Sequence, residues 1–159
     1  MNANIDKIIN DIVSTYVSKP SDLDNVTLDL ARKIIHKVEE KAKEMGVKAV
    51  VAVADRGGRT IAVECMDDSY IASYDIAVNK AYTCVSLKMS TKKLSTLAQP
   101  GQSLYGIQFT NNGKIVIFGG GEPLCVNGKV IGAVGVSGGS EEQDTLLGAY
   151  AKDVFNNLI

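Results

Sequence analysis

The chain has 159 residues, 45% of them hydrophobic and 22% charged, with a formal net charge of −1. That length suits a single domain with a sizeable core, and the charge balance argues against nucleic acid as a partner, because nucleic-acid binding needs a basic face. No apolar run approaches the roughly 18 residues of a membrane span, so no membrane partner is expected. The N-terminus lacks the charged and apolar regions of a signal peptide, and the cytoplasm is therefore the expected location.

The cysteines and the histidine limit the chemistry further. Cys65, Cys84 and Cys125 are odd in number and widely spaced, which is typical of reduced thiols, and their apolar neighbours predict buried, unreactive side chains. No pair of these residue types has the spacing of a zinc site, and we expect no bound metal. His36 is the one histidine, and no signature pairs it with a nucleophile, so catalytic residues stay unassigned.

The predicted elements begin with a short amphipathic helix. Its apolar residues recur at helical spacing with polar residues opposite; they are Ile5, Ile8, Ile9, Ile12, Val13, Tyr16 and Val17. Pro20 ends the segment, because proline disfavours helix at the preceding residue and cannot donate a backbone hydrogen bond. Residues 1–20 are therefore expected to be a helix and linker, and residues 21–159 a separate domain.

Four further helices are expected in this domain. They lie near residues 27–46, 70–87, 90–98 and from 141 onward. Thr27 is expected to cap the first of them. Ser140 and Gln143 have the spacing of a capping box at the start of the last.

Turns that contain glycine separate three pairs of predicted strands. The pairs are 49–54 with 60–65, 106–111 with 114–118, and 123–126 with 129–137. The second and third turns are Asn-Gly, the strongest short hairpin signal, because both residues tolerate positive φ. Tight hairpins imply antiparallel neighbours, so the fold class is α+β, with helices covering an antiparallel sheet of about five strands.

Two glycine-rich stretches are candidate ligand-binding segments. Gly119, Gly120 and Gly121 follow a predicted strand, where they form either a tight turn or bulge or a close backbone approach to a ligand. They do not form a P-loop, because Pro123 and a strand follow instead of a helix. Residues 132–139 lead into a helix with acidic residues in its first turn, which argues against phosphate binding; small residues there also suit close packing of a strand on a helix.

Several polar side chains are candidates for a pocket. Lys80 interrupts the apolar stripe of its helix, so its amine either reaches solvent or points into a pocket as a charge partner. Tyr105 lies in a glycine-bounded loop, where it either lines a pocket or packs. We predict a ligand pocket from Asp55, Lys80, Tyr105, Gly119, Gly120, Gly121 and Glu142.

Four acids could chelate a hard cation if the fold gathered them. They are Asp67, Asp68, Glu142 and Asp144. The first two lie in a strand-to-helix turn, where aspartate commonly caps a helix. His36 shares the polar face of its helix with charged residues, which favours a solvated side chain.

Nine stretches of the chain, taken in order, carry a resemblance to a known family: 28–46, 51–58, 72–77, 80–81, 100–101, 104–106, 119–124, 132–139 and 142–144. Together they resemble the GlcG/HbpS family, which includes the C-terminal domain of PduO proteins. The resemblance implies a profilin- or roadblock-like sandwich, with helices flanking a five-stranded antiparallel sheet, and assembly into a homo-oligomer.

The resemblance also implies a function. Family members are linked to haem and PduO proteins to corrinoid metabolism, so the expected cofactor is haem or cobalamin, held by an accessory protein. His36 would be the haem ligand, at a contact between subunits. The corrinoid adenosyltransferase activity of PduO belongs to its other domain and is not expected here. The alternatives are a small enzyme of unknown reaction, which uses the predicted pocket, and an oligomeric assembly module.

The N-terminal helix resembles the encapsulation peptides of bacterial microcompartments, which are short amphipathic helices joined to cargo by a linker. The resemblance implies that the protein is cargo in the microcompartment lumen. It also implies that residues 1–17 bind a shell protein through Ile5, Ile8, Ile9, Ile12, Val13 and Tyr16. The alternative is packing of this helix on its own domain or on a neighbouring subunit.

Overall fold

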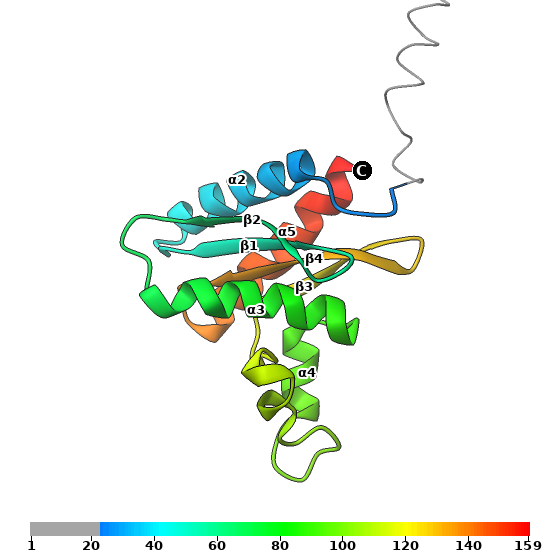
Figure 1. The fold of residues 1–159 in the computed structure, drawn as a ribbon. Coiled ribbons are helices and arrows are strands. Elements are labelled where there is room, and N and C mark those ends of the chain that lie inside the picture. Colours follow the sequence, from blue (N-terminus) through cyan, green and yellow to red (C-terminus); the bar gives the residue numbers. More distant parts are fainter. Residues whose placement is uncertain (1–22) are drawn as a thin grey trace, which may run out of the picture.

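The computed structural model describes residues 23–159, in which helices flank a four-stranded antiparallel sheet (Figure 1). The sheet has the order β2-β1-β4-β3, with β1 at Val50–Asp55, β2 at Thr60–Cys65, β3 at Gly121–Val126 and β4 at Lys129–Ser137. The helices are α2 (Leu28–Glu44), α3 (Ile71–Leu87), α4 (Thr91–Leu97) and α5 (Glu141–Leu158). The predicted α+β class is confirmed, with four strands in place of about five. The helix predicted within residues 1–20 lies outside the described residues.

The sheet separates two layers of helices (Figure 1). α2 and α5 cover one face, and their apolar sides form the larger core with residues such as Val51, Val53 and Val134. α3 covers the other face, where Ala77 and Ala81 pack on small strand residues. The two layers follow from the alternation of side chains along each strand, which sends successive residues to opposite faces.

Gly135 in β4 allows α3 to lie very close to the sheet. A Cβ at this position would lie 2.7 Å from the backbone nitrogen of Ala81 and 3.0 Å from Lys80 Cβ. The first distance is shorter than packed carbon and nitrogen atoms adopt, so only glycine fits. The prediction that small residues in 132–139 serve close strand-to-helix packing is confirmed here.

The hairpin predicted for 106–111 and 114–118 is wrong, whereas the pairings of β1 with β2 and of β3 with β4 confirm the other two. The stretch forms two 3₁₀ turns, η2 (Ile107–Phe109) and η3 (Asn111–Gly113). After these turns, the amide of Val116 donates to the Thr83 hydroxyl of α3 at 3.0 Å. A helix side chain therefore takes the backbone hydrogen bond that a neighbouring strand would otherwise supply.

Both predicted helix starts are confirmed. The Thr27 hydroxyl accepts from the amide of Leu30 at 3.2 Å and caps α2. At α5, Ser140 and Gln143 make both hydrogen bonds of the capping box. No helix within residues 23–159 is long and apolar enough to cross a membrane.

Candidate functional site

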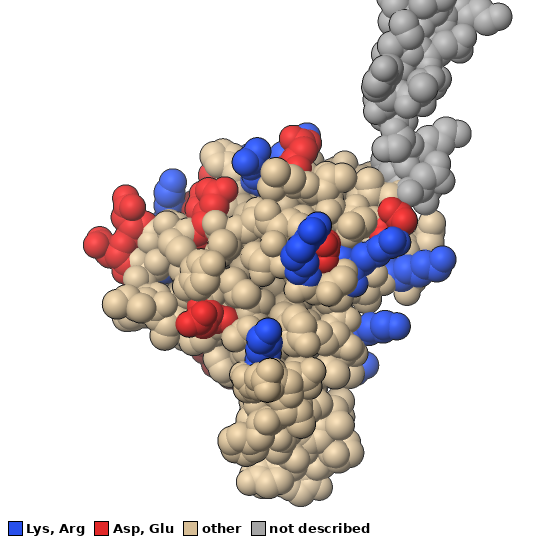
Figure 2. Space-filling view, viewed as in Figure 1, with Lys and Arg blue, Asp and Glu red and all other residues tan. Residues whose placement is uncertain are grey.

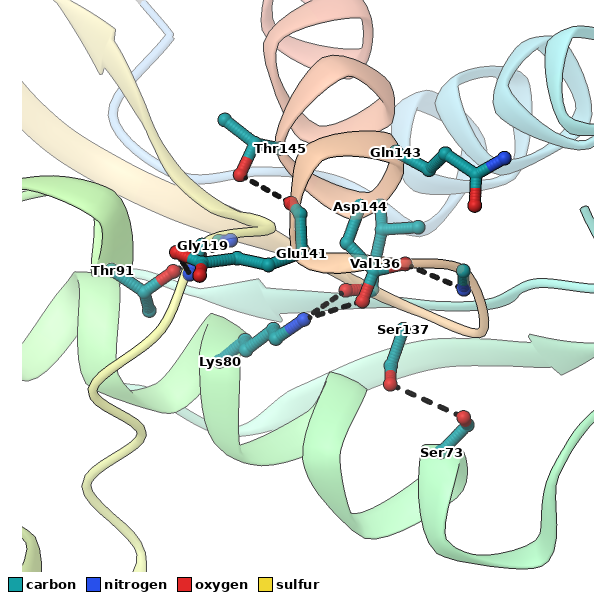
Figure 3. Close-up of polar contacts among 12 residues, drawn as sticks. Ser73, Lys80, Thr91, Gly119, Val136, Ser137, Glu141, Gln143, Asp144 and Thr145 are labelled. Atoms are coloured by element: carbon teal, nitrogen blue, oxygen red, sulfur yellow. Dashed lines mark hydrogen bonds and ion pairs between the residues drawn. The ribbon is translucent and has the colours of Figure 1, made fainter. Parts of the chain in front are cut away.

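Lys80 lies at the centre of a buried polar cluster between α3, β4 and α5 (Figure 3). Its side chain has no exposed surface. The amine Nζ donates to Asp144 Oδ2 at 2.8 Å and to Val136 O at 2.7 Å, and it lies 4.8 Å from the centre of the Phe118 ring. An ammonium has three hydrogens, and two oxygens and an aromatic face surround this one. Of the two interpretations of Lys80, the geometry supports the buried charge partner.

Asp144 both neutralises Lys80 and closes the glycine-rich turn before α5. Its Oδ1 accepts from the amide of Gly139 at 2.9 Å while its Oδ2 accepts from Lys80. Burial raises the pKa of Asp144 and lowers the pKa of Lys80, and in both cases the attraction between the two groups opposes the effect of burial. The protein's own carboxylate thus uses the Gly139 amide, a donor that a bound anion would otherwise need.

The triple glycine packs against the same cluster. Gly120 has a φ of +116°, and a Cβ there would lie 2.6 Å from Lys80 Nζ. A Cβ at Gly121 would lie 2.8 Å from Cys84 Sγ and from Thr91 Cγ2. Between a ligand cradle and a tight turn, this geometry favours the turn, because protein atoms already fill the space beside the glycines.

The remaining predicted pocket residues make their contacts elsewhere. Asp55 Oδ1 accepts from the amides of Gly57 at 2.9 Å and Arg59 at 3.0 Å, which closes the turn between β1 and β2. Tyr105 is exposed in the segment after α4. Glu142 is exposed in the first turn of α5, where a hydrogen bond from its own amide lowers the pKa of its side chain. The structure thus brings Lys80 and the glycines together and leaves these three in other contacts.

A hollow of about 260 Å³ opens beside the Lys80 cluster. Its lining residues come from the start of α3, the segment before β3, the end of β4 and the start of α5, and include Tyr70, Ser73, Ile76, Phe118, Ser137 and Asp144. Ser137 Oγ donates to Ser73 Oγ at 3.2 Å within it (Figure 3). The charged residues of the lining are acids, Glu141 and Asp144, which disfavours an anionic ligand.

A larger hollow, of about 520 Å³, lies where the end of α2 meets the end of β2. It is lined by Glu39, Lys43, Gly46, Val47, Lys48, Cys65, Met66, Asp67 and Asp68. Lys48 pairs with Asp68 at 2.8 Å on its rim. His36 lies one turn before Glu39 on the same face of α2, with 70% of its side chain exposed and Nε2 at 3.3 Å from Glu40 Oε1. This hollow therefore combines apolar walls and two sulfur atoms with mixed charge: Lys43 and Lys48 lie beside the acids Glu39, Asp67 and Asp68.

The cysteines differ in accessibility, which corrects the prediction that all three are buried. Cys84 is buried, and burial strongly raises the pKa of its thiol. Cys65 is exposed at the last position of β2, and Cys125 is half-buried. The exposed end of an edge strand explains Cys65, because its apolar neighbour Met66 turns inward, where its sulfur accepts from the amide of Ala49 at 3.3 Å.

The acids considered as a cation site do not gather. Asp68 pairs with Lys48 and Asp144 pairs with Lys80. Within residues 23–159, no group of three or more histidine, cysteine, aspartate and glutamate residues is placed to hold a metal ion.

Two features of these sites are not predicted by the sequence analysis. The first is the pairing of Lys80 with Asp144, because the two residues lie 64 positions apart. The sequence feature that points to Asp144 is its place as an acid in the first turn of a helix that follows a glycine-rich strand. The hollow at the end of α2 was not predicted either. No recognisable motif includes Lys43, Lys48 or Cys65. They share a site because the fold brings the end of α2 beside the end of β2.

Residues 26–152 match the family model described as haem degrading protein HbpS-like. The chain belongs to the HbpS-like family. It is 49% identical over 142 residues to a 15.0 kDa protein in the dhaT-dhaS intergenic region of Citrobacter freundii, a match that covers 89% of this chain and 100% of that protein. The family predicted from the motifs is thereby confirmed.

Two further HbpS-like relatives carry names related to tetrapyrroles. The chain is 42% identical over 105 residues to the corrinoid adenosyltransferase PduO of Salmonella typhimurium; the match covers 66% of this chain and 31% of PduO, so it spans about a third of that relative. The crystal structure of a PduOC:heme complex is similar with a TM-score of 0.78 and 35% identity, over 81% of this chain and 94% of that one.

Proposed function

We propose that this chain is an accessory tetrapyrrole-binding protein whose ligand is haem. The observation that carries the proposal is the hollow of about 520 Å³ at the end of α2, where apolar walls, lysines and donor side chains share one face. The complex of the relative PduOC with haem supports haem as the first ligand to test. Cobalamin is the second, since a PduO relative acts on corrinoids by its name.

The residues around this hollow fit haem. Val47 and Met66 supply apolar surface. Lys43 supplies positive charge for one propionate carboxylate, and Lys48 would serve a second by exchanging its present partner Asp68 for the propionate. His36, on the same face of α2, is the proposed iron ligand. Bound haem would supply a redox-active iron; the side chains of this chain would hold the porphyrin, orient it and pair its carboxylates.

Cys65 is the competing iron ligand. Its thiol is exposed and lines the hollow itself, and haem iron accepts cysteine thiolate as well as histidine. The two donors give different spectra, because a thiolate donates more electron density to iron than an imidazole does. Variants of the two residues therefore separate the two modes of ligation.

Titration of haemin into the purified chain tests the proposal. We expect a shifted Soret band that saturates at one haem per chain at micromolar concentration. His36→Ala should weaken binding at least about tenfold, equivalent to about 1.4 kcal/mol, and displace the Soret band, while Cys65→Ser leaves both unchanged. The opposite pattern would assign the iron to Cys65, and the absence of any Soret shift in the natural chain would reject haem binding.

Two lysines outside the hollow give a matched control for the location of the haem site. Lys43→Gln combined with Lys48→Gln should weaken haem binding, because the propionates lose their cations. Lys88→Gln combined with Lys93→Gln changes the charge equally at exposed positions outside the hollow and should leave binding unchanged. Equal losses in both double variants would place haem elsewhere. Parallel titrations with cobalamin show whether a corrinoid uses the same site.

We further propose that the protein is a homo-oligomeric cargo of a bacterial microcompartment. The support for the cargo role is the apolar stripe in the sequence of residues 1–17, in which Ile8 and Ile12 have the spacing of one face of a helix. A fluorescent fusion expressed with shell proteins should co-localise with them, and Ile8→Asp with Ile12→Asp should abolish this. Asp6→Asn on the polar side is the control. Unchanged co-localisation of the double aspartate variant would contradict shell targeting.

A further inference from the structure

The outer side of α3 is poor in charge. Asp75 and the buried Lys80 are the charged residues of this helix, whereas α2, on the opposite face of the sheet, has acids and bases along its exposed side. Tyr70, just before α3, is 73% exposed, Ile71 is 97% exposed, and Tyr74 is 46% exposed one turn later. A helix that is apolar on both sides is typical of one that is covered on both sides.

The segment after α3 adds a second uncharged surface, which we name the arm. It comprises residues 94–113, which contain no aspartate, glutamate, lysine, arginine or histidine. It runs from α4 through η2 and η3 and projects from the body, and the face seen in Figure 2 is uncharged over this projection (Figures 1 and 2). Tyr105 is 64% and Phe109 83% exposed. Gln108 Oε1 is buried without a hydrogen-bond partner among the described residues. Exposed aromatic residues without charge are typical of protein interfaces.

We infer that the arm of one chain packs on the outer side of α3 of a second copy of this chain. The arm projects below the C-terminal part of α3, and the N-terminal part of α3 lies beside the start of α5 (Figure 1). A second copy related by a two-fold axis would place its arm against the exposed side chains at the start of α3 and receive the first arm in return. Phe109 of one chain would then contact Ile71 and Tyr74 of the partner subunit.

The low net charge of this face favours a second copy as its occupant. In a two-fold contact the whole face, α3 together with the arm, meets a copy of itself, so net charge on it would cause repulsion. On this face Asp75 of α3 is balanced by Lys114, which follows the arm and has Nζ 5.6 Å from the centre of the Tyr82 ring of α3; the arm itself has no charged residue. Nucleic acid would need basic residues here. The inference rests on the proposed homo-oligomer and names its contact surface; it does not depend on haem.

The arm is also ordered by its own hydrogen bonds, so it can present a fixed surface. The amide of Leu104 donates to Leu97 O at 3.0 Å, which ties the loop back to the end of α4. The amide of Tyr105 donates to Gln102 O at 3.1 Å, and the amide of Phe109 donates to Gly106 O at 3.1 Å. A surface that is ordered before contact loses less conformational entropy on binding.

Sedimentation equilibrium across a concentration series tests the contact. We expect the natural chain to self-associate, and Ile71→Lys and Phe109→Glu each to raise the dissociation constant at least about tenfold. Leu146→Glu is the matched control, because Leu146 is 62% exposed on α5, outside the proposed surface. Circular dichroism verifies that each variant is folded. A natural chain that is monomeric at roughly 100 μM, or an equal effect of Leu146→Glu, would overturn the inference.

A charge-complementing variant tests the pairing of the arm with α3. A chain that carries both Ile71→Lys and Phe109→Glu should regain most of the lost association, because the introduced ammonium of one copy faces the introduced carboxylate of the other. Failure to regain it would overturn this placement. Haem titration of the same variants is independent. A monomer that binds haem contradicts the interface and the homo-oligomer but leaves haem binding standing, and an oligomer that binds no haem does the reverse.

Discussion

Asp144→Asn should destabilise the fold severely, because it leaves the Lys80 ammonium buried without its counter-charge. Lys80 has no exposed surface and Asp144 is 3% exposed, so water from the adjoining hollow replaces the lost carboxylate only poorly. The asparagine can still accept from the amide of Gly139, yet its own amide nitrogen would face the donor Nζ of Lys80. Breaking one side of a buried ion pair costs about 3–5 kcal/mol, a large part of the roughly 5–15 kcal/mol that stabilises a typical domain.

Urea unfolding of four proteins measures this cost: the natural chain, Asp144→Asn, Lys80→Met, and a double variant with Lys80→Met and Asp144→Leu. The double variant should lose less than the two single losses together, because no charge is left unpaired. Its remaining cost is the loss of partners at Gly139 N and Val136 O, about 1–3 kcal/mol each. Additive losses, or a loss below about 1 kcal/mol for Asp144→Asn, would refute a buried and coupled pair.

Other parts of the fold give further predictions. Gly135→Ala should cost about 3 kcal/mol in the same unfolding assay, because its methyl would meet the backbone of α3. Gly46→Ala is the control: Gly46 has φ +68° and no atom within 4 Å of a Cβ, so the variant should cost about 1 kcal/mol of left-handed strain. Equal losses would contradict the close approach of α3 to β4. A thiol reagent at about pH 8 should label Cys65 first and Cys84 only after unfolding, because burial raises the pKa of Cys84, and peptide mass spectrometry would contradict this if Cys84 reacted in the native chain. Ser140→Ala should lower the free energy of unfolding by about 0.5–2 kcal/mol through the lost cap of α5, and an unchanged value would mean that the capping box contributes nothing.

Two Asn-Gly turns show how far sequence patterns can specify this fold. Asn112 and Gly113 have φ values of 57° and 74°, and Asn127 and Gly128 have 50° and 76°. Both dipeptides thus adopt the conformation that their sequence predicts. A hairpin forms only at Asn127-Gly128, because β3 and β4 flank this turn and pair with each other. After Asn112-Gly113, the amide of Val116 donates to the Thr83 hydroxyl instead of to a neighbouring strand. Local residues determine the turn; the partner of a strand depends on the rest of the fold.

The same distinction applies to the candidate sites. Helix caps such as Ser140 with Gln143 were predictable because both hydrogen bonds close within four residues. The role of Lys80 was open between solvent and a charge partner, because its carboxylate is 64 positions away and reaches it only when α5 folds back over the sheet. The sequence around Lys80 and the sequence around Asp144 give no indication that the two side chains meet.

The residues that identify the family and those proposed to bind its ligand therefore lie in different places. Lys80 and the glycines at 119–121 are recognisable because close packing excludes other residues there, and that packing concerns the stability of the fold. Lys43 and Cys65 line the proposed haem site without any such constraint, so they can differ among relatives that share the fold. It follows that substitutions in the buried cluster should change the free energy of unfolding with little effect on haem affinity in the folded fraction, while substitutions at the hollow should do the opposite.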